Sequence, residues 1–294
     1  MLALLPLRGA ALTAYITAMT TQSTRLKTQP LPTDNVLLRR NDGPIAILTL
    51  NRPDARNSLS EGLIAALQSE FDAIATQNDI RAVVIAANGS AFSAGHDLKE
   101  LTARRSDADG GRAYYARIMT MCSAMMQTVV RLPKPVIASV QGIASAAGCQ
   151  LVATCDLAVA SDAAMFATPG VDIGLFCSTP MVALSRNVSR KHAMGMLLTG
   201  EPIDAETARA MGLVNRVAPA GKELDAAIEM AKVVASKSTR TVRIGKEAFY
   251  RQLEMPLSDA YRYTAEVMTE NMMARDAEEG INAFIAKRPP IWEE

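Results

Sequence analysis

The stretch PVIASVQGIASAAGCQLVATC, residues 135–155, decides the fold of this chain. It contains no charged side chain, so its surroundings must be apolar. An apolar run of this length could form a membrane-spanning helix, but Gln141, Gln150 and two glycines interrupt it. We interpret it instead as a buried strand, VIASV, a tight turn, and a buried helix that begins near Ala146. DLAVAS (156–161) follows as the next strand, so the order strand, helix, strand predicts βαβ units in a mainly parallel sheet.

The flanking segments extend this α/β pattern. VLLRRNDGPIAILTLNRP (36–53) predicts two strands joined by a turn, and AVVIAANG (82–89) predicts a buried parallel strand. Between them, LSEGLIAALQSEFDAIATQ (59–77) has the apolar spacing of a helix with Ser60 as its N-cap. Further helices are predicted at 113–130, 190–199, 204–211, 222–236, 241–253, 257–274 and 276–286, and one short strand at 213–217.

This pattern divides the chain into an α/β core, residues 34–200, and an α-helical C-terminal region, residues 201–294. Residues 1–33 stand apart, because they contain basic side chains but no acidic one. We interpret them either as a mitochondrial transit peptide or as a non-native extension, with Met19 as the true first residue of the protein. In both cases we expect a disordered segment outside the fold. Pro6 and Arg8 interrupt the apolar run at the N-terminus, so we do not expect secretion. We expect the mitochondrial matrix if the source is eukaryotic, and the cytoplasm if it is bacterial.

Composition excludes several classes of function. The chain has 31 basic and 30 acidic residues and a net charge of +1, without the basic tract that nucleic-acid binding requires. Its 4 cysteines form no CxxC pair, and its 2 histidines lie far from any cysteine pair. We therefore expect buried free thiols in a reducing compartment and no metal site.

Two strand-to-helix turns could carry chemistry: AFSAGHDLKEL (91–101) and QGIASAAGCQL (141–151). Ligands of α/β folds bind at the carboxyl ends of strands, where helix N-termini present backbone N–H groups. Two such N–H groups converging on one oxygen would form an oxyanion hole. The alternative is that these small residues only serve chain geometry, and the turns alone leave both interpretations open.

A series of ordered motifs favours the functional interpretation. They are NRPDARNSLS, AFSAGHDLKEL, KPVIASVQGIASAAGCQLVATCDLAVAS, FATPGVDIGL, LTGEPIDAETARAMGLVNRV and FIAKRPP. In this order and spacing, across residues 34–294, they resemble the crotonase superfamily, also called the enoyl-CoA hydratase/isomerase family. The resemblance implies a crotonase-like ββα spiral core and an acyl-CoA thioester as partner. It also implies a homotrimer or hexamer with the C-terminal helices at the interfaces.

The resemblance also assigns site residues. The oxyanion donors should be the backbone N–H groups of His96 and Ala147. Because Ala147 stands where relatives often have glycine, its φ need not be positive. The side chains of Arg56, Lys99 and Lys287 suit phosphate groups, although each could equally be a solvated surface charge. Coenzyme A should lie along Asp54, Ala55, Arg56, Ala94, Asp97, Leu98 and Lys99, with Phe284 and Lys287 at its nucleotide end.

The chain departs from the family at both hydratase carboxylates. Where the resemblance places glutamates that activate a water, this chain has Gln150 and Gly170. Losing a general acid or base typically costs about 10²–10⁴-fold in rate, so we expect weak hydratase activity or none. Asp172 and the His96 ring are candidate substitutes, although the carboxylate could be structural and the ring could simply pack.

The sequence therefore predicts an acyl-CoA-binding member of this family, acting in fatty-acid or acyl-CoA metabolism. It needs no cofactor beyond the coenzyme A of its substrate. Two alternatives remain. One is decarboxylation or hydrolysis of a CoA thioester, which needs mainly an oxyanion-stabilising site. The other is acyl-CoA binding without catalysis.

Overall fold

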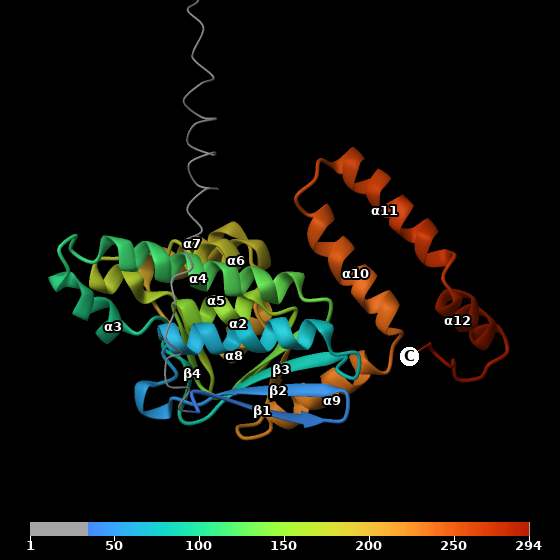
Figure 1. The fold of residues 1–294 in the computed structure, drawn as a ribbon, viewed down its shortest axis with the longest axis horizontal. Helices are drawn as coiled ribbons and strands as arrows, with labels where there is room; N and C mark the ends of the chain where they lie inside the picture. Colours follow the sequence, from blue (N-terminus) through green and yellow to red (C-terminus); the bar gives the residue numbers. More distant parts are fainter. Residues whose placement is uncertain (1–34, 294) are drawn as a thin grey trace, which may run out of the picture. The chain divides into compact units, whose positions relative to one another are not determined.

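A six-stranded sheet is the framework of residues 35–293, which the computed structural model describes (Figure 1). Its order is β1-β2-β3-β5-β7-β10, and neighbours are parallel except in the β1–β2 hairpin. This confirms the predicted hairpin and mainly parallel sheet, whereas the expected extension at 1–33 lies outside the described residues. The strands are β1 (Leu37–Asp42), β2 (Ile45–Leu50), β3 (Ala82–Ala87), β5 (Val136–Val140), β7 (Leu157–Ser161) and β10 (Arg216–Ala218).

Helices cover both faces of this sheet, which explains why β3 and β5 are buried along almost their whole length. Alternate residues of β3 point to opposite faces: Val83 and Ile85 join one core cluster, and Val84 joins the other. The helices α2 (Glu61–Thr76), α4 (Arg112–Arg131) and α5 (Ala147–Thr154) contribute to the first cluster. The second contains side chains of α9 (Glu223–Ala235).

Short strands form a second sheet, with four strands in the described range and the order β4-β6-β8-β9. Here β4, β6 and β8 run parallel and follow β3, β5 and β7 along the chain, so a strand–strand–helix unit repeats. This is the expected ββα spiral. The tight turn predicted after VIASV is wrong, because strand β6 forms there by pairing with β4 and β8. The strands are β4 (Ala91–Ser93), β6 (Ile143–Ser145), β8 (Met165–Ala167) and β9 (Ile203–Asp204).

The predicted helices form close to their expected bounds. Ser60 caps α2 as predicted, because its hydroxyl accepts a hydrogen bond from the Leu63 N–H. The remaining helices before α9 connect the strands at the layer edges. They are α3 (Leu98–Ala103), α6 (Pro180–Asn187), α7 (Arg190–Thr199), α8 (Ala205–Met211) and the 3₁₀ helices η1 (Pro53–Ala55), η2 (Arg104–Ser106) and η3 (Pro169–Ile173).

The expected boundary near residue 200 falls inside the folded layers. β9 and β10 lie beyond it and complete the two sheets, and α9 packs on the large sheet, so these parts belong with the core. The region without strands begins only at α10 (Thr239–Gln252) and continues through α11 (Leu257–Met272) and α12 (Arg275–Ile285). Figure 1 shows these three helices extending away from the sheets.

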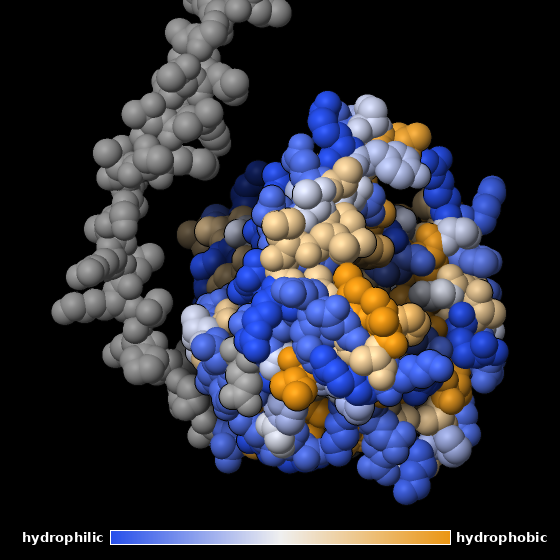
Figure 2. All heavy atoms as spheres, turned by 90° about the vertical axis from the view of Figure 1, so that its right-hand side faces the viewer, coloured by the Kyte–Doolittle hydropathy of each residue, from blue (hydrophilic) through white to orange (hydrophobic). Residues whose placement is uncertain are grey.

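The helices α10 to α12 expose many large apolar side chains. Figure 2 faces this end and shows apolar side chains interspersed among hydrophilic ones. Exposed apolar side chains in such numbers often mark a surface that binds a partner. The side chains that are at least half exposed include Phe249, Leu253, Tyr261, Met268, Met272, Phe284 and Ile285.

Candidate active site

The two turns selected from the sequence meet in the structure. Because β4 and β6 are parallel neighbours, the segments that leave them emerge at one edge of the small sheet. Gly95 has φ +91°, and a Cβ on it would stand 2.9 Å from the Ala146 Cβ and 3.2 Å from the Ala147 nitrogen. The absence of a side chain at Gly95 therefore allows the turns to touch.

Both predicted donors are free at this junction. Within the described residues, neither the His96 N–H nor the Ala147 N–H donates a hydrogen bond to another protein group. Ala147 is the first residue of α5, where N–H groups have no acceptor within the helix. Two N–H groups on touching turns at strand ends suit an oxygen that gains negative charge.

The backbone strain lies one residue before the predicted donor. Ala147 has no positive φ, in agreement with the sequence expectation. Ala146 instead has φ +50° and ψ −116°, a conformation that costs a residue with a Cβ about 1–3 kcal/mol. Its N–H donates to the Ala167 carbonyl at 2.9 Å, which holds the strained residue against β8.

The helix α5 reaches this position because Gly148 lacks a side chain. A Cβ there would stand 2.2 Å from the Ser93 carbonyl oxygen, which belongs to β4. The first turn of α5 thus packs directly on the backbone of the small sheet. This close approach fixes where the free Ala147 N–H points.

The residues expected to hold coenzyme A fall into two groups that the structure brings together. Asp54, Ala55 and Arg56 lie in or directly after η1, and the Arg56 carbonyl accepts a hydrogen bond from the Ala94 N–H at 3.0 Å. Ala94 belongs to the second group, whose Leu98 and Lys99 open α3 and are exposed.

Asp97 fixes these two groups to each other. Its carboxylate caps α3 and forms an ion pair with Arg52 at 3.0 Å, and it accepts a hydrogen bond from Ser58 at 3.1 Å. Burial acts to raise the pKa of Asp97, but the hydrogen bonds from Arg52 and Ser58 outweigh it, so this pKa lies below its usual value. The Asp97 side chain is therefore engaged in holding the loop. Its backbone is bonded as well, because its N–H donates to the Leu59 carbonyl and its carbonyl accepts from the Leu101 N–H.

Asn57 is a positioning residue that sequence reasoning missed. It is fully buried, and its amide donates to the carbonyls of Asn88 and Ala91, each at 2.8 Å. These bonds tie the segment after η1 to the start of β4. The motif NRPDARN contains the residue, but nothing in the motif shows which strand it would bind.

The structure does not bring Phe284 and Lys287 to these groups within one chain. Phe284 is 84% exposed near the end of α12, and α12 packs on α11 in the C-terminal arm, which consists of α10 to α12. Figure 1 places this arm away from α3 and β4. Any contribution of these two residues to the same ligand would have to come from another copy of the chain.

Gln150 is buried on the second turn of α5 and lines a large cavity. Its amide oxygen has no hydrogen-bond partner among the described residues. Gly170 lies in η3, where a Cβ would stand 2.8 Å from the Leu175 carbonyl oxygen and 2.9 Å from the Cys177 sulfur. The backbone around residue 170 therefore leaves no room for a larger side chain without rearrangement.

The two candidate substitutes differ in environment. Asp172 is exposed, and its carboxylate oxygens stand 3.0 and 3.1 Å from the point that a Cβ on Gly200 would occupy, against the end of α7. Both ring nitrogens of His96 are buried, and no described group bonds to them. Burial lowers the pKa of His96 and outweighs the opposing effect of the Leu59 backbone, which favours the neutral ring.

The chain is similar to known proteins along most of its length. A family model described as enoyl-CoA hydratase/isomerase matches residues 40–294. The chain belongs to the enoyl-CoA hydratase/isomerase family. Enoyl-CoA hydratase domain-containing protein 3, mitochondrial, of Homo sapiens is 47% identical to it over 268 residues, 91% of this chain and 86% of the relative. A putative enoyl-CoA hydratase of Thermus thermophilus is 37% identical over 84% of this chain and 97% of its own length.

Solved structures of the family confirm the fold. An enoyl-CoA hydratase of Mycobacterium smegmatis superposes with a TM-score of 0.83 at 49% identity, covering 87% of this chain and 98% of that one. Human enoyl Coenzyme A hydratase domain-containing protein 3 gives a TM-score of 0.83 at 46% identity, covering 87% of this chain and all of its own.

The cysteines of this family member are free and buried, as predicted. Burial raises the pKa of Cys122 and of Cys149 to about 12, and it also raises the pKa of Cys155 and of Cys177. A thiol must ionise to act as a nucleophile, so these groups are inert at neutral pH.

The sequence analysis did not predict a buried polar cluster that lies between α10 and the core. Lys246 of α10 forms an ion pair with Asp156 at 2.7 Å, and Tyr250 donates to the same carboxylate at 2.9 Å. Lys246 also donates to the carbonyls of Val129 and Lys134. Burial lowers the pKa of Lys246, and Asp156 opposes that shift. The cluster attaches α10 to the core.

The described residues of the chain contain no group of three or more His, Cys, Asp or Glu side chains arranged to bind a metal ion. No helix between residues 35 and 293 is long and apolar enough to span a bilayer.

Proposed function

We propose that this chain binds acyl-CoA thioesters of fatty-acid or acyl-CoA metabolism and polarises the thioester carbonyl. The observation that carries this proposal is the pair of free N–H groups, His96 and Ala147, on two touching turns. In such a site one donor is typically worth about 3–4 kcal/mol toward an oxyanion or enolate. Membership of the enoyl-CoA hydratase/isomerase family supports the same ligand class.

Coenzyme A would lie along η1 and the start of α3. Arg56 and Lys99 support this placement, because both are exposed and neither forms an ion pair within the described residues. Both can therefore contact phosphate without losing an existing partner. Phe284 and Lys287 would reach the nucleotide end from a neighbouring subunit.

The same site would be a poor hydratase. The amide of Gln150 cannot take up a proton from water, and Gly170 offers no side chain. Neither substitute is well suited: Asp172 is exposed, and the His96 ring is buried without a partner. We therefore expect the thioester carbonyl to be polarised while water is not activated.

Infrared spectroscopy tests the polarisation without assuming any reaction. Octanoyl-CoA labelled with ¹³C at the thioester carbonyl is added to the protein, and the labelled band is compared with that of the free ester. We expect a shift to lower frequency, because hydrogen-bond donors weaken the C=O bond. Binding without a shift would refute the carbonyl-polarising role, and no binding by calorimetry would refute the proposed ligand.

Turnover assays separate the reaction classes. Crotonyl-CoA should be hydrated far more slowly than by ordinary hydratases, with products followed by mass spectrometry. Ordinary rates would refute our interpretation of Gln150 and Gly170. A site with oxyanion donors and no paired carboxylates favours decarboxylation of a malonyl-type CoA or thioester hydrolysis as the second candidate. No turnover across such a panel would leave acyl-CoA binding as the function.

The exposed apolar side chains of α10 to α12 support assembly as a homotrimer or hexamer. We expect light scattering at micromolar concentration to show such an oligomer, and a monomer would contradict it. We also propose a mitochondrial location if the source is eukaryotic, because the human relative is named mitochondrial. N-terminal sequencing of the native protein would test whether residues 1–33 are removed.

A further inference from the structure

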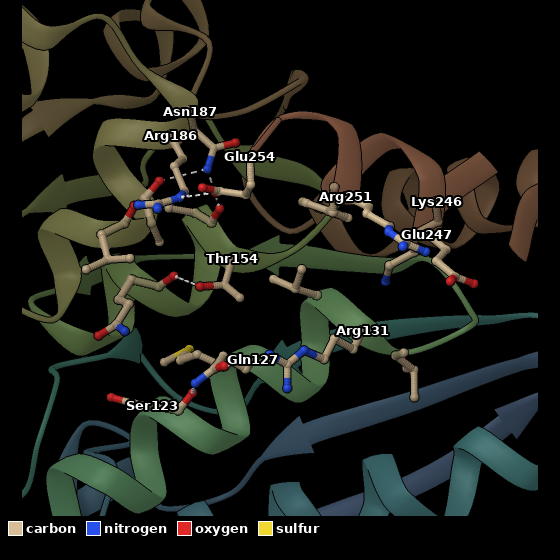
Figure 3. Close-up of a pocket in the computed structure, with 18 of the residues that line it drawn as sticks. Ser123, Gln127, Arg131, Thr154, Arg186, Asn187, Lys246, Glu247, Arg251 and Glu254 are labelled. Atoms are coloured by element: carbon tan, nitrogen blue, oxygen red, sulfur yellow. Dashed lines mark hydrogen bonds and ion pairs between the residues drawn. The ribbon is translucent and has the colours of Figure 1, made fainter. Parts of the chain in front are cut away.

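A cavity of about 880 Å³ lies between α4, α5, α6 and α10 (Figure 3). This volume is in the range of small-molecule sites. Gln150 lines it and lies one helical turn after Ala147 on α5, so the cavity begins close to the proposed carbonyl site. An acyl chain whose thioester binds at Ala147 would therefore extend past Gln150 into this cavity.

The cavity has an apolar wall and a charged one. Met126, Val130, Ala153 and Val182 supply apolar surface that suits methylene groups. α4 also carries Arg131 on one side of the cavity, and α10 carries several charged side chains on the other (Figure 3). A purely hydrocarbon chain would use only the first of these walls.

Some of the charged side chains already have partners. Lys246 is neutralised by Asp156, and Arg186 forms an ion pair with Glu254 at 3.1 Å. These pairs leave no net charge for a ligand. The first pair holds α10 against the core, and the second joins α6 to the turn after α10.

The remaining arginines do not have such partners. Arg131, Arg243 and Arg251 line the cavity, and none of them forms an ion pair within residues 35–293. Arg251 stacks over the Tyr263 ring at 4.7 Å, and Arg131 donates to Gln127, so both are oriented by neutral groups. Glu247 is the one lining carboxylate without a partner in this range. A chain with a net charge of only +1 thus concentrates positive charge here.

We infer that this cavity accepts an acyl group with a carboxylate at its far end. The substrates would then be CoA monothioesters of medium-chain dicarboxylic acids. This inference rests on the proposed acyl-CoA function. Ala153 lies about 9 Å along α5 from Ala147, and the Asn187 amide donates to its carbonyl at 2.7 Å. Ala153 lines the same cavity as the three arginines, so we expect a carboxylate on a chain that spans this length to lie near the charged wall.

The test compares two esters that differ only at the far end: octanoyl-CoA and suberyl-CoA, the monothioester of octanedioic acid. Calorimetry measures the Kd of each for the full chain and for Arg131→Gln/Arg243→Gln. The matched control is Arg112→Gln/Arg240→Gln, which removes two exposed arginines from the same helices outside the cavity. Thermal unfolding checks that all three proteins are folded.

We expect the unmodified chain to bind suberyl-CoA about tenfold more tightly than octanoyl-CoA, since each exposed arginine contributes modestly. This preference should fall to near onefold in the cavity variant and persist in the control, with octanoyl-CoA affinity unchanged. Equal binding of both esters, or a preference that survives in the cavity variant, would overturn the inference while the proposed function stands. Failure of both esters to bind would overturn both.

Discussion

Replacing Gly95 by alanine should damage the carbonyl site directly. The new Cβ would stand 2.9 Å from the Ala146 Cβ, 3.1 Å from the Ser145 carbonyl oxygen and 3.2 Å from the Ala147 nitrogen. All three atoms belong to the backbone or to a short side chain, so none can move aside freely. The two turns must separate, and their N–H groups can then no longer reach one oxygen.

The expected cost has two parts. A φ of +91° strains any residue with a Cβ by about 1–3 kcal/mol. Overpacking against the facing turn adds a further cost of about 1–3 kcal/mol. Gly110→Ala is the matched control, because Gly110 has φ +67° and no atom near its would-be Cβ, so it carries only the first part.

Urea denaturation and infrared spectroscopy together test this reasoning. The free energy of unfolding should fall further in Gly95→Ala than in Gly110→Ala. Octanoyl-CoA should bind about fivefold more weakly for each donor lost, and its labelled carbonyl band should return toward the frequency of the free ester. Equal unfolding free energies for the two variants, with an unchanged carbonyl band in both, would refute the proposed contact between the turns.

Three more substitutions test other parts of the structure. Gln150→Glu should raise the rate of crotonyl-CoA hydration by less than about tenfold. One general acid or base is typically worth about 10²–10⁴-fold in a complete site, but here the second carboxylate is still missing. Asp97→Asn should lower the free energy of unfolding at pH 7 by about 1–2 kcal/mol after solvent screening, through its lost bond to Arg52. The pKa of Asp97 is lowered in the folded state, so this difference is present above the ordinary aspartate pKa of 3.8 and should disappear as pH falls below it. Lys246→Met should cost about 3–5 kcal/mol in urea denaturation, because Asp156 stays buried without its cation.

Each of these outcomes has a contrary result. A hundredfold gain in Gln150→Glu would mean that another group already acts as the partner carboxylate. A pH-independent effect of Asp97→Asn would mean that the ion pair is not the cause. Lys222→Met is the control for Lys246→Met, since its pair with Asp225 is exposed and should contribute less than about 1 kcal/mol. A cost of Lys246→Met no larger than that of this control would mean that the pair with Asp156 does not attach α10.

The elements predicted from periodicity formed because their burial repeats over several turns or residues. The helix at 59–77 presents Leu63, Ile64, Leu67, Phe71 and Ile74 to the core, which is the pattern visible in the sequence. The strands β4, β6 and β8 were missed, because three residues are too few to show alternation. They exist only by pairing with one another, and this pairing is not encoded locally.

The candidate site was predictable only in part. Strand ends and small residues indicated both turns, and the family resemblance identified His96 and Ala147. The run of small residues does not show which of them takes the strained φ, and that residue proved to be Ala146. The ion pair between Lys246 and Asp156 joins residues far apart in the chain, so neither helical periodicity nor any motif indicates it.

The attachment of α10 has a consequence for which acyl chains the protein can accept. The only residue of α10 that is buried is Ala248, so charged and polar bonds to Asp156 fix the helix in place of apolar packing. Sliding α10 by one turn, about 5.4 Å, would break the bonds of Lys246 and Tyr250 together, so intermediate positions gain nothing. The bonds of Lys246 and Tyr250 therefore hold α10 at one position and at one distance from α5. The protein should therefore show an abrupt upper limit of chain length instead of a gradual decline in affinity.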